Sequence, residues 1–150
     1  MRAYSEAFWK VGETYIPDFD KIVKRIEEGE KKILEKLEMA AILTAKVKSV
    51  DNPWDNLTLK YGNNRGKLFN EEEDRFLLCM TDKLGYGKWE ELKREERMRP
   101  EFRFDWLFKS RTPIELGRRV DLLIRIIKSE TQGKEKPAKK QKVSAGDNEE

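Results

Sequence analysis

The sequence predicts an all-α fold in which a module of three short helices follows one long helix. Apolar residues recur every three or four positions through residues 18–50, which is the spacing of one helix face. Two later segments begin with strong helix-start signals, at Asn70 and Thr112. The one stretch that alternates like a strand, residues 102–108, has no partner strand elsewhere in the chain and would be marginal as a strand.

Residues 18–50 are predicted to form a long amphipathic helix. Its weakest point is Gly29, because glycine inside a helix costs about 1 kcal/mol relative to alanine, and two helices meeting there are an open alternative. Pro17 is expected to separate this helix from a short helix over residues 2–15. The apolar stripe consists of Phe19, Ile22, Ile26, Ile33, Leu37, Ala41 and Val47.

Residues 51–67 are expected to form an ordered connector. They combine Asn-Pro, Gly-Asn-Asn and Arg-Gly, each of which disfavours a continued helix. Trp54, Leu57 and Leu59 are the side chains expected to pin this connector to the core.

The first helix of the module is predicted over about residues 71–84. Asn70 can cap its N-terminus, and Glu73 three residues later completes a capping box. The acidic first turn faces the positive end of the helix dipole. The side chains expected to be buried are Phe76, Leu77, Met80 and Leu84, with Cys79 as a small buried neighbour.

The second and third helices are predicted on either side of an aromatic stretch. The segment "KWEELKREERM" favours a short helix that ends before Pro100, with Trp89 on its buried face. The third helix begins with Thr112 as N-cap, a proline at the first helical position and Glu115 at the third. Its expected buried face consists of Leu116, Val120, Leu123 and Ile127.

The composition limits both the size of the core and the chemistry. A chain of 150 residues with 37% hydrophobic content can form one modest domain plus extensions. One cysteine and no histidine exclude a disulfide framework, a Cys/His zinc site and a Ser-His or Cys-His catalytic pair. We therefore expect no catalytic residues, no metal site and no cofactor.

The two ends of the chain carry further expectations. The N-terminus lacks the apolar run of a signal peptide, and no stretch approaches the roughly 20 apolar residues that span a bilayer, so a soluble intracellular protein is expected. Residues 131–150 have almost no apolar content and are expected to be disordered. Their "KEKPAKKQK" run is open to three interpretations: a nuclear import signal, a nonspecific DNA-binding tail or a solvated tail.

Charges of the two signs are segregated along the module. Residues 109–128 hold six cations and two anions, a net charge of +4, whereas residues 71–84 hold two cations and five anions, a net charge of −3. A local positive field suits a polyanion, because each cation placed at a phosphate releases condensed counterions. The candidate DNA-binding residues are Lys109, Arg111, Arg118, Arg119, Arg125 and Lys128.

Each candidate also has an alternative. The basic face could be an ordinary solvated helix face. Lys109 and Arg111 could pair with Glu101 or Asp105 instead of phosphate. Arg119 lies between the two faces of its helix and could bind an acidic residue of the first helix, such as Glu72 or Glu73.

The stretch "FRFDWLFKSRT", residues 102–112, concentrates aromatic side chains in this highly charged chain. They could stack on nucleic-acid bases, but the intervening charges leave no continuous aromatic platform. A small domain needs several large rings in its core, so burial of all four in a packed turn or short helix is the favoured interpretation. The rings are Phe102, Phe104, Trp106 and Phe108.

Residues 61–130 resemble the SLIDE domain of the imitation-switch (ISWI) nucleosome-remodelling ATPases, which is related to SANT and Myb three-helix domains. The matching words are "YGNNRGKLFNEEEDRFLLCMTDKLGYGKWEEL", "FRFDWLFKSRT" and the "EL-x-RR" of "ELGRRV". Upstream, "KIVKRIEEGEKKI" is similar to the spacer helix between SANT and SLIDE. Implied domains are 1–17 (remnant of the SANT end), 18–50 (spacer helix), 51–130 (SLIDE-like domain) and 131–150 (tail).

The resemblance implies a nuclear, monomeric, non-catalytic module that grips double-stranded linker DNA of the nucleosome through its backbone, without sequence readout. No GxxxxGK[ST] phosphate loop and no helicase core fit in the chain. The alternative is a protein-interaction module that binds a histone or a remodeller subunit through residues 18–50. Gly117 and Val120 depart from the family pattern, and Gly117 is expected to loosen the third helix.

Overall fold

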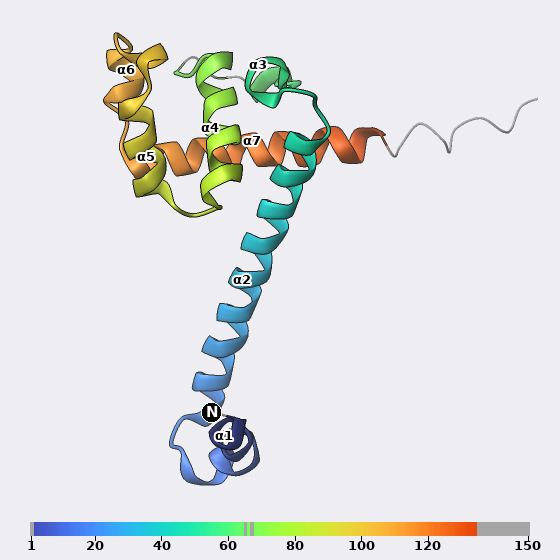
Figure 1. Cartoon of the computed structure of the whole chain (residues 1–150). Helices are drawn as coiled ribbons and strands as arrows, with labels where there is room; N and C mark the ends of the chain where they lie inside the picture. Colours follow the sequence, from blue (N-terminus) through green and yellow to red (C-terminus); the bar gives the residue numbers. More distant parts are fainter. Residues whose placement is uncertain (1, 65, 67, 135–150) are drawn as a thin grey trace, which may run out of the picture. The chain divides into compact units, whose positions relative to one another are not determined.

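The computed structural model describes residues 2–64, 66 and 68–134. All regular secondary structure in those residues is helical, which confirms the all-α prediction (Figure 1). Two short 3-10 helices accompany the α-helices, at Gly62–Asn64 and Pro100–Phe102. The α-helices are α1 (Arg2–Tyr15), α2 (Phe19–Lys48), α3 (Pro53–Asn56), α4 (Glu71–Leu84), α5 (Trp89–Met98), α6 (Trp106–Lys109) and α7 (Pro113–Lys134).

The chain divides into two compact units, Met1–Glu38 and Met39–Glu150. In the first unit, the ring of Phe8 lies 5.1 Å from that of Trp9 and 5.2 Å from that of Phe19. Gly12 allows this packing, because a Cβ there would collide with the Phe19 ring. The small cluster therefore joins α1 to the start of α2.

α2 runs through Gly29 as one helix, so the alternative of two helices meeting there is wrong. The predicted apolar stripe is only partly buried. Ile33 and Leu37 are 61% and 62% exposed, whereas Leu43, at the other end of the helix, is 1% exposed. The part of α2 that contributes to a core is the part in the second unit.

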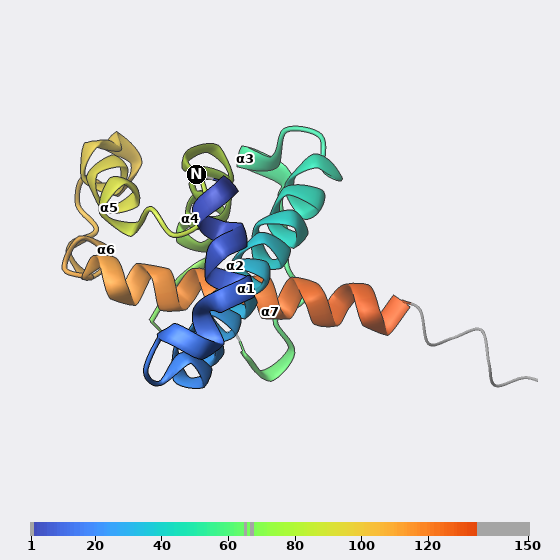
Figure 2. The ribbon, with the colours of Figure 1, turned by 90° about the horizontal axis from the view of Figure 1, so that it is seen from below.

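The core of the second unit is formed by α4, α5 and α7. Figures 1 and 2 both show α7 running past α4 and α5, and it packs against each of them. The end of α2 adds Leu43 to this core, and Thr44 Oγ1 donates a hydrogen bond to Asp82 Oδ1 at 2.5 Å. Three of the four α4 side chains predicted to be buried are buried, and Leu84 is half-buried.

Both predicted capping boxes are present. Asn70 Oδ1 accepts from the Glu73 N–H at 2.8 Å, and Glu73 Oε2 accepts from the Asn70 N–H at 3.0 Å. At the start of α7, Glu115 Oε2 accepts from the Thr112 N–H at 2.7 Å, and Thr112 Oγ1 accepts from the Glu115 N–H at 3.3 Å. These reciprocal bonds fix where the two longest helices of the core begin.

Gly117 does not loosen α7. It is buried inside a continuous helix, and an added Cβ would lie 2.8–2.9 Å from the indole ring of Trp89. The expectation of a loosened helix is therefore wrong. The missing side chain at Gly117 lets the Trp89 ring of α5 pack directly on the backbone of α7.

The expected disorder of residues 131–150 is wrong for the first four of them, since α7 continues to Lys134, and the other residues of that segment lie outside the described part. No helix of the described residues is long and apolar enough to span a membrane. Cys79 is buried as expected, and burial raises the pKa of its thiol to about 11.

Candidate nucleic-acid interface

α7 presents one face to the core and another to solvent. Leu116, Val120 and Leu123 are fully buried, whereas Arg118 and Arg125 are exposed. The capping box at Thr112 sets the start of the helix, and the 3.6-residue period then places these two arginines opposite the buried side. Their guanidinium groups are available to an external anion.

Asp121 lies between these arginines on the same face but is engaged by the protein itself. Its carboxylate accepts a hydrogen bond from the hydroxyl of Tyr86. Burial and this carboxylate together raise the pKa of Tyr86 above its usual value, so the hydroxyl stays a donor. The exposed charge on this face is therefore mainly that of Arg118 and Arg125.

Arg119, although a candidate in the sequence, is buried. Its Nε and Nη2 each lie 2.7 Å from a carboxylate oxygen of Asp74, which is 1% exposed. The guanidinium also lies over the Phe69 ring, 4.9 Å from its centroid. The predicted pairing with an acidic residue of the first helix is found, but with Asp74 instead of Glu72 or Glu73. This ion pair holds α7 to α4.

Lys109 lies at the end of α6 and is half-buried. Its backbone oxygen accepts a hydrogen bond from the buried Lys93 Nζ at 2.8 Å, and Lys93 is paired at 2.6 Å with Glu96. This link attaches α5 to the loop that precedes α7. The position of Lys109 is therefore set by a buried ion pair of another helix.

Arg111 lies in the same loop, and its side chain is 16% exposed. Its guanidinium lies 5.7 Å from the centroid of the Phe69 ring and 3.4 Å from Glu115. The two acidic partners considered from sequence are occupied elsewhere, since Glu101 pairs with Arg99 at 3.8 Å and Asp105 caps α6.

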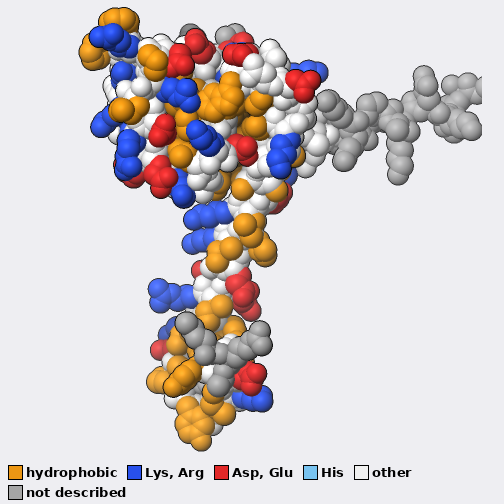
Figure 3. Space-filling view, in the orientation of Figure 1, with side chains coloured by type: hydrophobic (Ala, Val, Ile, Leu, Met, Phe, Trp, Pro, Cys, Tyr) orange, Lys and Arg blue, Asp and Glu red, His pale blue; other side chains and the backbone are white. Residues whose placement is uncertain are grey.

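A groove of about 520 Å³ runs between α5 and the loop before α7. Arg94 and Arg97 line one side, and Lys109 and Arg111 line the other. Figure 3 shows Lys and Arg side chains, with Asp and Glu side chains among them, over the part of the molecule that contains α5. Sequence reasoning missed Arg94 and Arg97, because four glutamates on the same helix conceal them in the charge count. Their i, i+3 spacing is the signal that could have found them.

A second hollow, of about 310 Å³, lies beside the first part of α7. Arg111 lines both this hollow and the groove, and Arg118 lines the hollow together with Leu68 and Leu122. Cationic side chains therefore extend from α5 across the loop to α7. We call these residues the cationic surface: Arg94, Arg97, Lys109, Arg111, Arg118 and Arg125.

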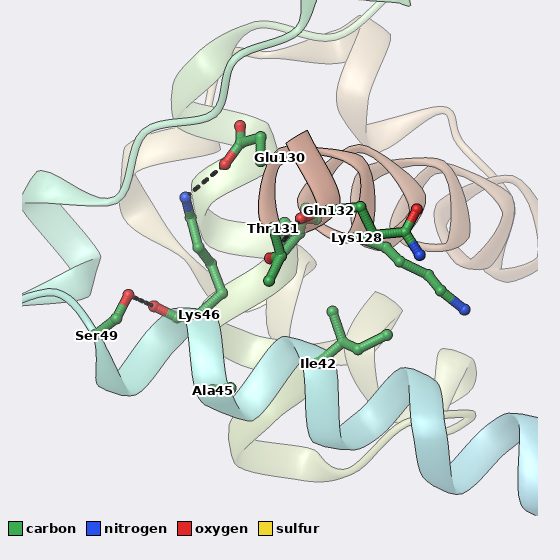
Figure 4. Close-up of a pocket in the computed structure, with 9 residues that line it drawn as sticks. Ile42, Ala45, Lys46, Ser49, Lys128, Glu130, Thr131 and Gln132 are labelled. Carbon is green, nitrogen blue, oxygen red and sulfur yellow. Dashed lines mark hydrogen bonds and ion pairs between the residues drawn. The ribbon is translucent and has the colours of Figure 1, made fainter. Parts of the chain in front are cut away.

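Lys128, the last candidate, lines a different hollow, of about 440 Å³, between the ends of α2 and α7. Here Lys46 is paired with Glu130 at 2.8 Å, and the ammonium of Lys128 points away from this pair (Figure 4). Burial opposes ionisation of Glu130, but hydrogen bonds from Lys46 and the Lys60 N–H outweigh it, so the pKa of that carboxyl lies below its ordinary value. Lys128 is half-buried and already has an interaction within the protein.

The fold and this surface define a class, an all-α module with one cationic surface assembled from two helices and the loop between them. The family model described as SLIDE matches residues 20–131, so the chain belongs to the SLIDE family, as the resemblance predicted. The match includes nearly all of α2.

Known relatives agree with this assignment. The chain is 50% identical over 133 residues to the "Probable chromatin-remodeling complex ATPase chain" of Oryza sativa subsp. japonica, which covers 87% of this chain and 12% of the relative. It is 48% identical over 145 residues to the "ISWI chromatin-remodeling complex ATPase CHR17" of Arabidopsis thaliana, and the match covers 95% of this chain and 14% of the relative.

The human "SWI/SNF-related matrix-associated actin-dependent regulator of chromatin subfamily A member 1" is 38% identical over 147 residues, covering 94% of this chain and 14% of its own length. The chain thus spans 12–14% of these relatives. The ATPase core of the relatives has no counterpart in these 150 residues.

Proposed function

We propose that this chain is a non-catalytic DNA-binding module that acts in chromatin remodelling in the nucleus, where it contacts the backbone phosphates of double-stranded linker DNA next to a nucleosome. The observation that carries the proposal is the cationic surface. Its six cations come from α5, α6, the following loop and α7. The buried Lys93 links α5 to the backbone oxygen of Lys109, and the Asp74–Arg119 ion pair holds α7 to α4. The names of the relatives support the chromatin context.

Phosphate contact without sequence readout fits the chemistry of this surface. Lysine and arginine bind phosphate oxygens through charge and hydrogen bonds, which fixes the register of a protein on DNA but carries no sequence information. The exposed face of α7 offers Arg118 and Arg125, about two helical turns apart, and no asparagine or glutamine between them to read an adenine edge. We therefore expect affinity that varies little with DNA sequence.

The domain assignment is part of this proposal. α1 corresponds to the end of a SANT domain, α2 to the spacer helix and residues 51–130 to the SLIDE-like domain. The protein is proposed to act as a monomer on DNA.

The test is a titration of duplex DNA with the full chain at several salt concentrations. A steep dependence of affinity on salt is expected, with a slope that falls by about 0.9 for each phosphate contact removed. Arg118→Ala combined with Arg125→Ala should therefore lower the slope by about 1.8 and leave the circular dichroism unchanged. The matched control is Lys31→Ala combined with Lys32→Ala, two exposed cations of α2, which should leave the slope as it is.

Two outcomes would contradict the proposal. One is an affinity that does not change with salt, or no binding at about 50 mM salt, where phosphate contacts are strong. The other is an equal loss of slope in the control variant, which would mean that total charge and not this surface determines binding.

A second candidate function is protein interaction through α2, and one observation favours it. Ile33, Leu34 and Leu37 are 61–65% exposed on one helix. If α2 binds a histone, purified histone octamer should bind the variant Arg118→Glu with Arg125→Glu, and lose binding when Ile33 and Leu37 become serine. If the arginine variant loses histone binding and the serine variant keeps it, α2 is not the binding site. DNA binding then remains the only proposed function.

A further inference from the structure

Two aromatic side chains of the segment between α5 and α7 are exposed to solvent. Phe104 is 78% exposed and Trp106 is 76% exposed, so the prediction that all four rings are buried is wrong for these two. Phe102 and Phe108 are buried, 4.9 Å apart at their ring centroids, and pack on Phe76 of α4. The buried pair anchors the segment, and the other pair projects from it.

Local hydrogen bonds fix the backbone that carries the projecting rings. The Trp106 N–H donates to the backbone oxygen of Phe104 at 3.1 Å, and the Phe108 N–H donates to Asp105 Oδ1 at 2.9 Å. Ser110 Oγ donates to the backbone oxygen of Leu107 at 2.8 Å. Phe104 therefore lies in the tight turn between the 3-10 helix and α6, and Trp106 is the first residue of α6. Exposed aromatic side chains that are held in place in this way are typical of binding sites.

The charges beside these rings are mainly positive. The guanidinium of Arg103 lies over the Phe104 ring, 5.6 Å from its centroid, and Lys109 follows Trp106 by one helical turn. Asp105, the anion between the two rings, is turned toward the protein, where it caps α6 and shares a hydrogen bond with the buried Glu73. Rings with cations beside them fit a partner that combines negative charge with flat apolar surfaces.

We propose that Phe104 and Trp106 form an apolar wedge that enters the minor groove of bound duplex DNA and partly unstacks one base step. The inference rests on the proposed function, because it requires DNA on the cationic surface. Lys109 belongs to that surface, and it follows Trp106 by three residues of α6, a rise of about 4.5 Å along the helix axis. A phosphate held by Lys109 therefore brings the edges of the neighbouring base pairs within reach of the rings.

Two projecting rings suit this role better than stacking along a single strand. Apolar side chains that insert between base steps kink duplex DNA, and the cost of unstacking is offset by contacts that the bent duplex makes with the protein. Here the groove beside Lys109 supplies those contacts, since Arg94 and Arg97 line its other side. The wedge would let the DNA backbone reach both the groove and α7.

The test uses the full chain, a short duplex labelled at both ends for energy transfer, and a second duplex carrying 2-aminopurine, whose fluorescence rises when its base unstacks. The wedge variant is Phe104→Ala with Trp106→Ala. The control is Tyr15→Ala, which removes an aromatic side chain that is also 78% exposed, in the other unit. Circular dichroism and thermal unfolding verify that each variant folds.

Wild type and control should shorten the end-to-end distance and raise 2-aminopurine fluorescence. The wedge variant should lose both signals and bind about tenfold more weakly. Its salt slope should fall by up to about 1.8, because the unbent duplex no longer reaches Arg94 and Arg97. Wild type that binds with the expected salt slope but distorts no duplex overturns the wedge alone. The wedge is also overturned if the wedge variant distorts the duplex as much as wild type does. It is overturned as well if the variant binds DNA with unchanged affinity, which would assign the rings to a protein partner. If wild type does not bind duplex, both proposals fail.

Discussion

Arg118 and Arg119 are adjacent in the sequence and identical in chemistry, yet they belong to two different regions. Arg118 lies on the cationic surface, exposed to solvent, whereas Arg119 lies in a buried ionic cluster with Asp74, which in turn interacts electrostatically with the buried Glu73. In the cluster, charge determines stability, because a buried charge without its partner is costly. On the surface, charge determines binding, because an exposed cation contributes little to folding but can hold a phosphate.

The largest expected effect is that of breaking the buried cluster. Asp74→Ala leaves the guanidinium of Arg119 buried without its carboxylate, and the free energy of unfolding should fall by about 3–5 kcal/mol. Arg118→Ala should change it by less than about 0.5 kcal/mol while weakening DNA binding. Chemical denaturation of both variants measures the contrast. Similar losses of stability in the two variants would remove the distinction between the regions.

The next effect depends on pH and concerns Glu73. Burial and a hydrogen bond with Asp105 raise the pKa of this carboxyl from 4.5 to about 7, although the N–H of Asn70 opposes the shift. The folded state therefore binds the proton more tightly than the unfolded state between about pH 4.5 and pH 7, and this group's contribution to stability falls as pH rises through that window.

Glu73→Gln sharpens this point, because glutamine keeps an oxygen for the Asn70 N–H and cannot lose a proton. The unfolding free energy of the variant, measured relative to wild type, should rise by about 2–3 kcal/mol on going from pH 5 to pH 8, because only wild type loses the proton. Thermal or urea unfolding of both proteins at pH 5 and at pH 8 measures this change. A difference between the proteins that is the same at pH 5 and pH 8 would show that Glu73 is ionised throughout.

The sequence predicts helices better than it predicts which charged and aromatic side chains reach the surface. Asn70 with Glu73, and Thr112 with Glu115, locate the starts of α4 and α7, because a capping box is a local arrangement. Phe104 and Trp106 look no different in sequence from Phe102 and Phe108. Which rings are buried depends on how the 3-10 helix and α6 turn the chain.

The site shows the same limit. The i, i+3 pair of Arg94 and Arg97 becomes part of the cationic surface only because α5 lies beside residues 109–113. Likewise, the partner of Arg119 depends on the packing of α7 against α4. Spacing along one helix gives the face of a residue, but the neighbours of that face come from the fold.

The smallest expected effect tests the contact that places α5 beside α7. Gly117→Ala puts a Cβ 2.8–2.9 Å from the Trp89 ring, which also packs against Tyr86 at 5.2 Å, so the ring must shift. Overpacking of this kind costs about 1–3 kcal/mol, and the better helix propensity of alanine returns about 1 kcal/mol. Gly29→Ala is the matched control, because nothing lies within 4 Å of the added Cβ and only the gain applies. The two variants should therefore differ in sign, with Gly117→Ala less stable than wild type and Gly29→Ala more stable. Because α5 carries Arg94 and Arg97, Gly117→Ala should also weaken DNA binding slightly, and Gly29→Ala should not.

If both variants stabilise the protein, Trp89 packs loosely against α7. The distance between the α5 and α7 parts of the cationic surface then does not depend on Gly117.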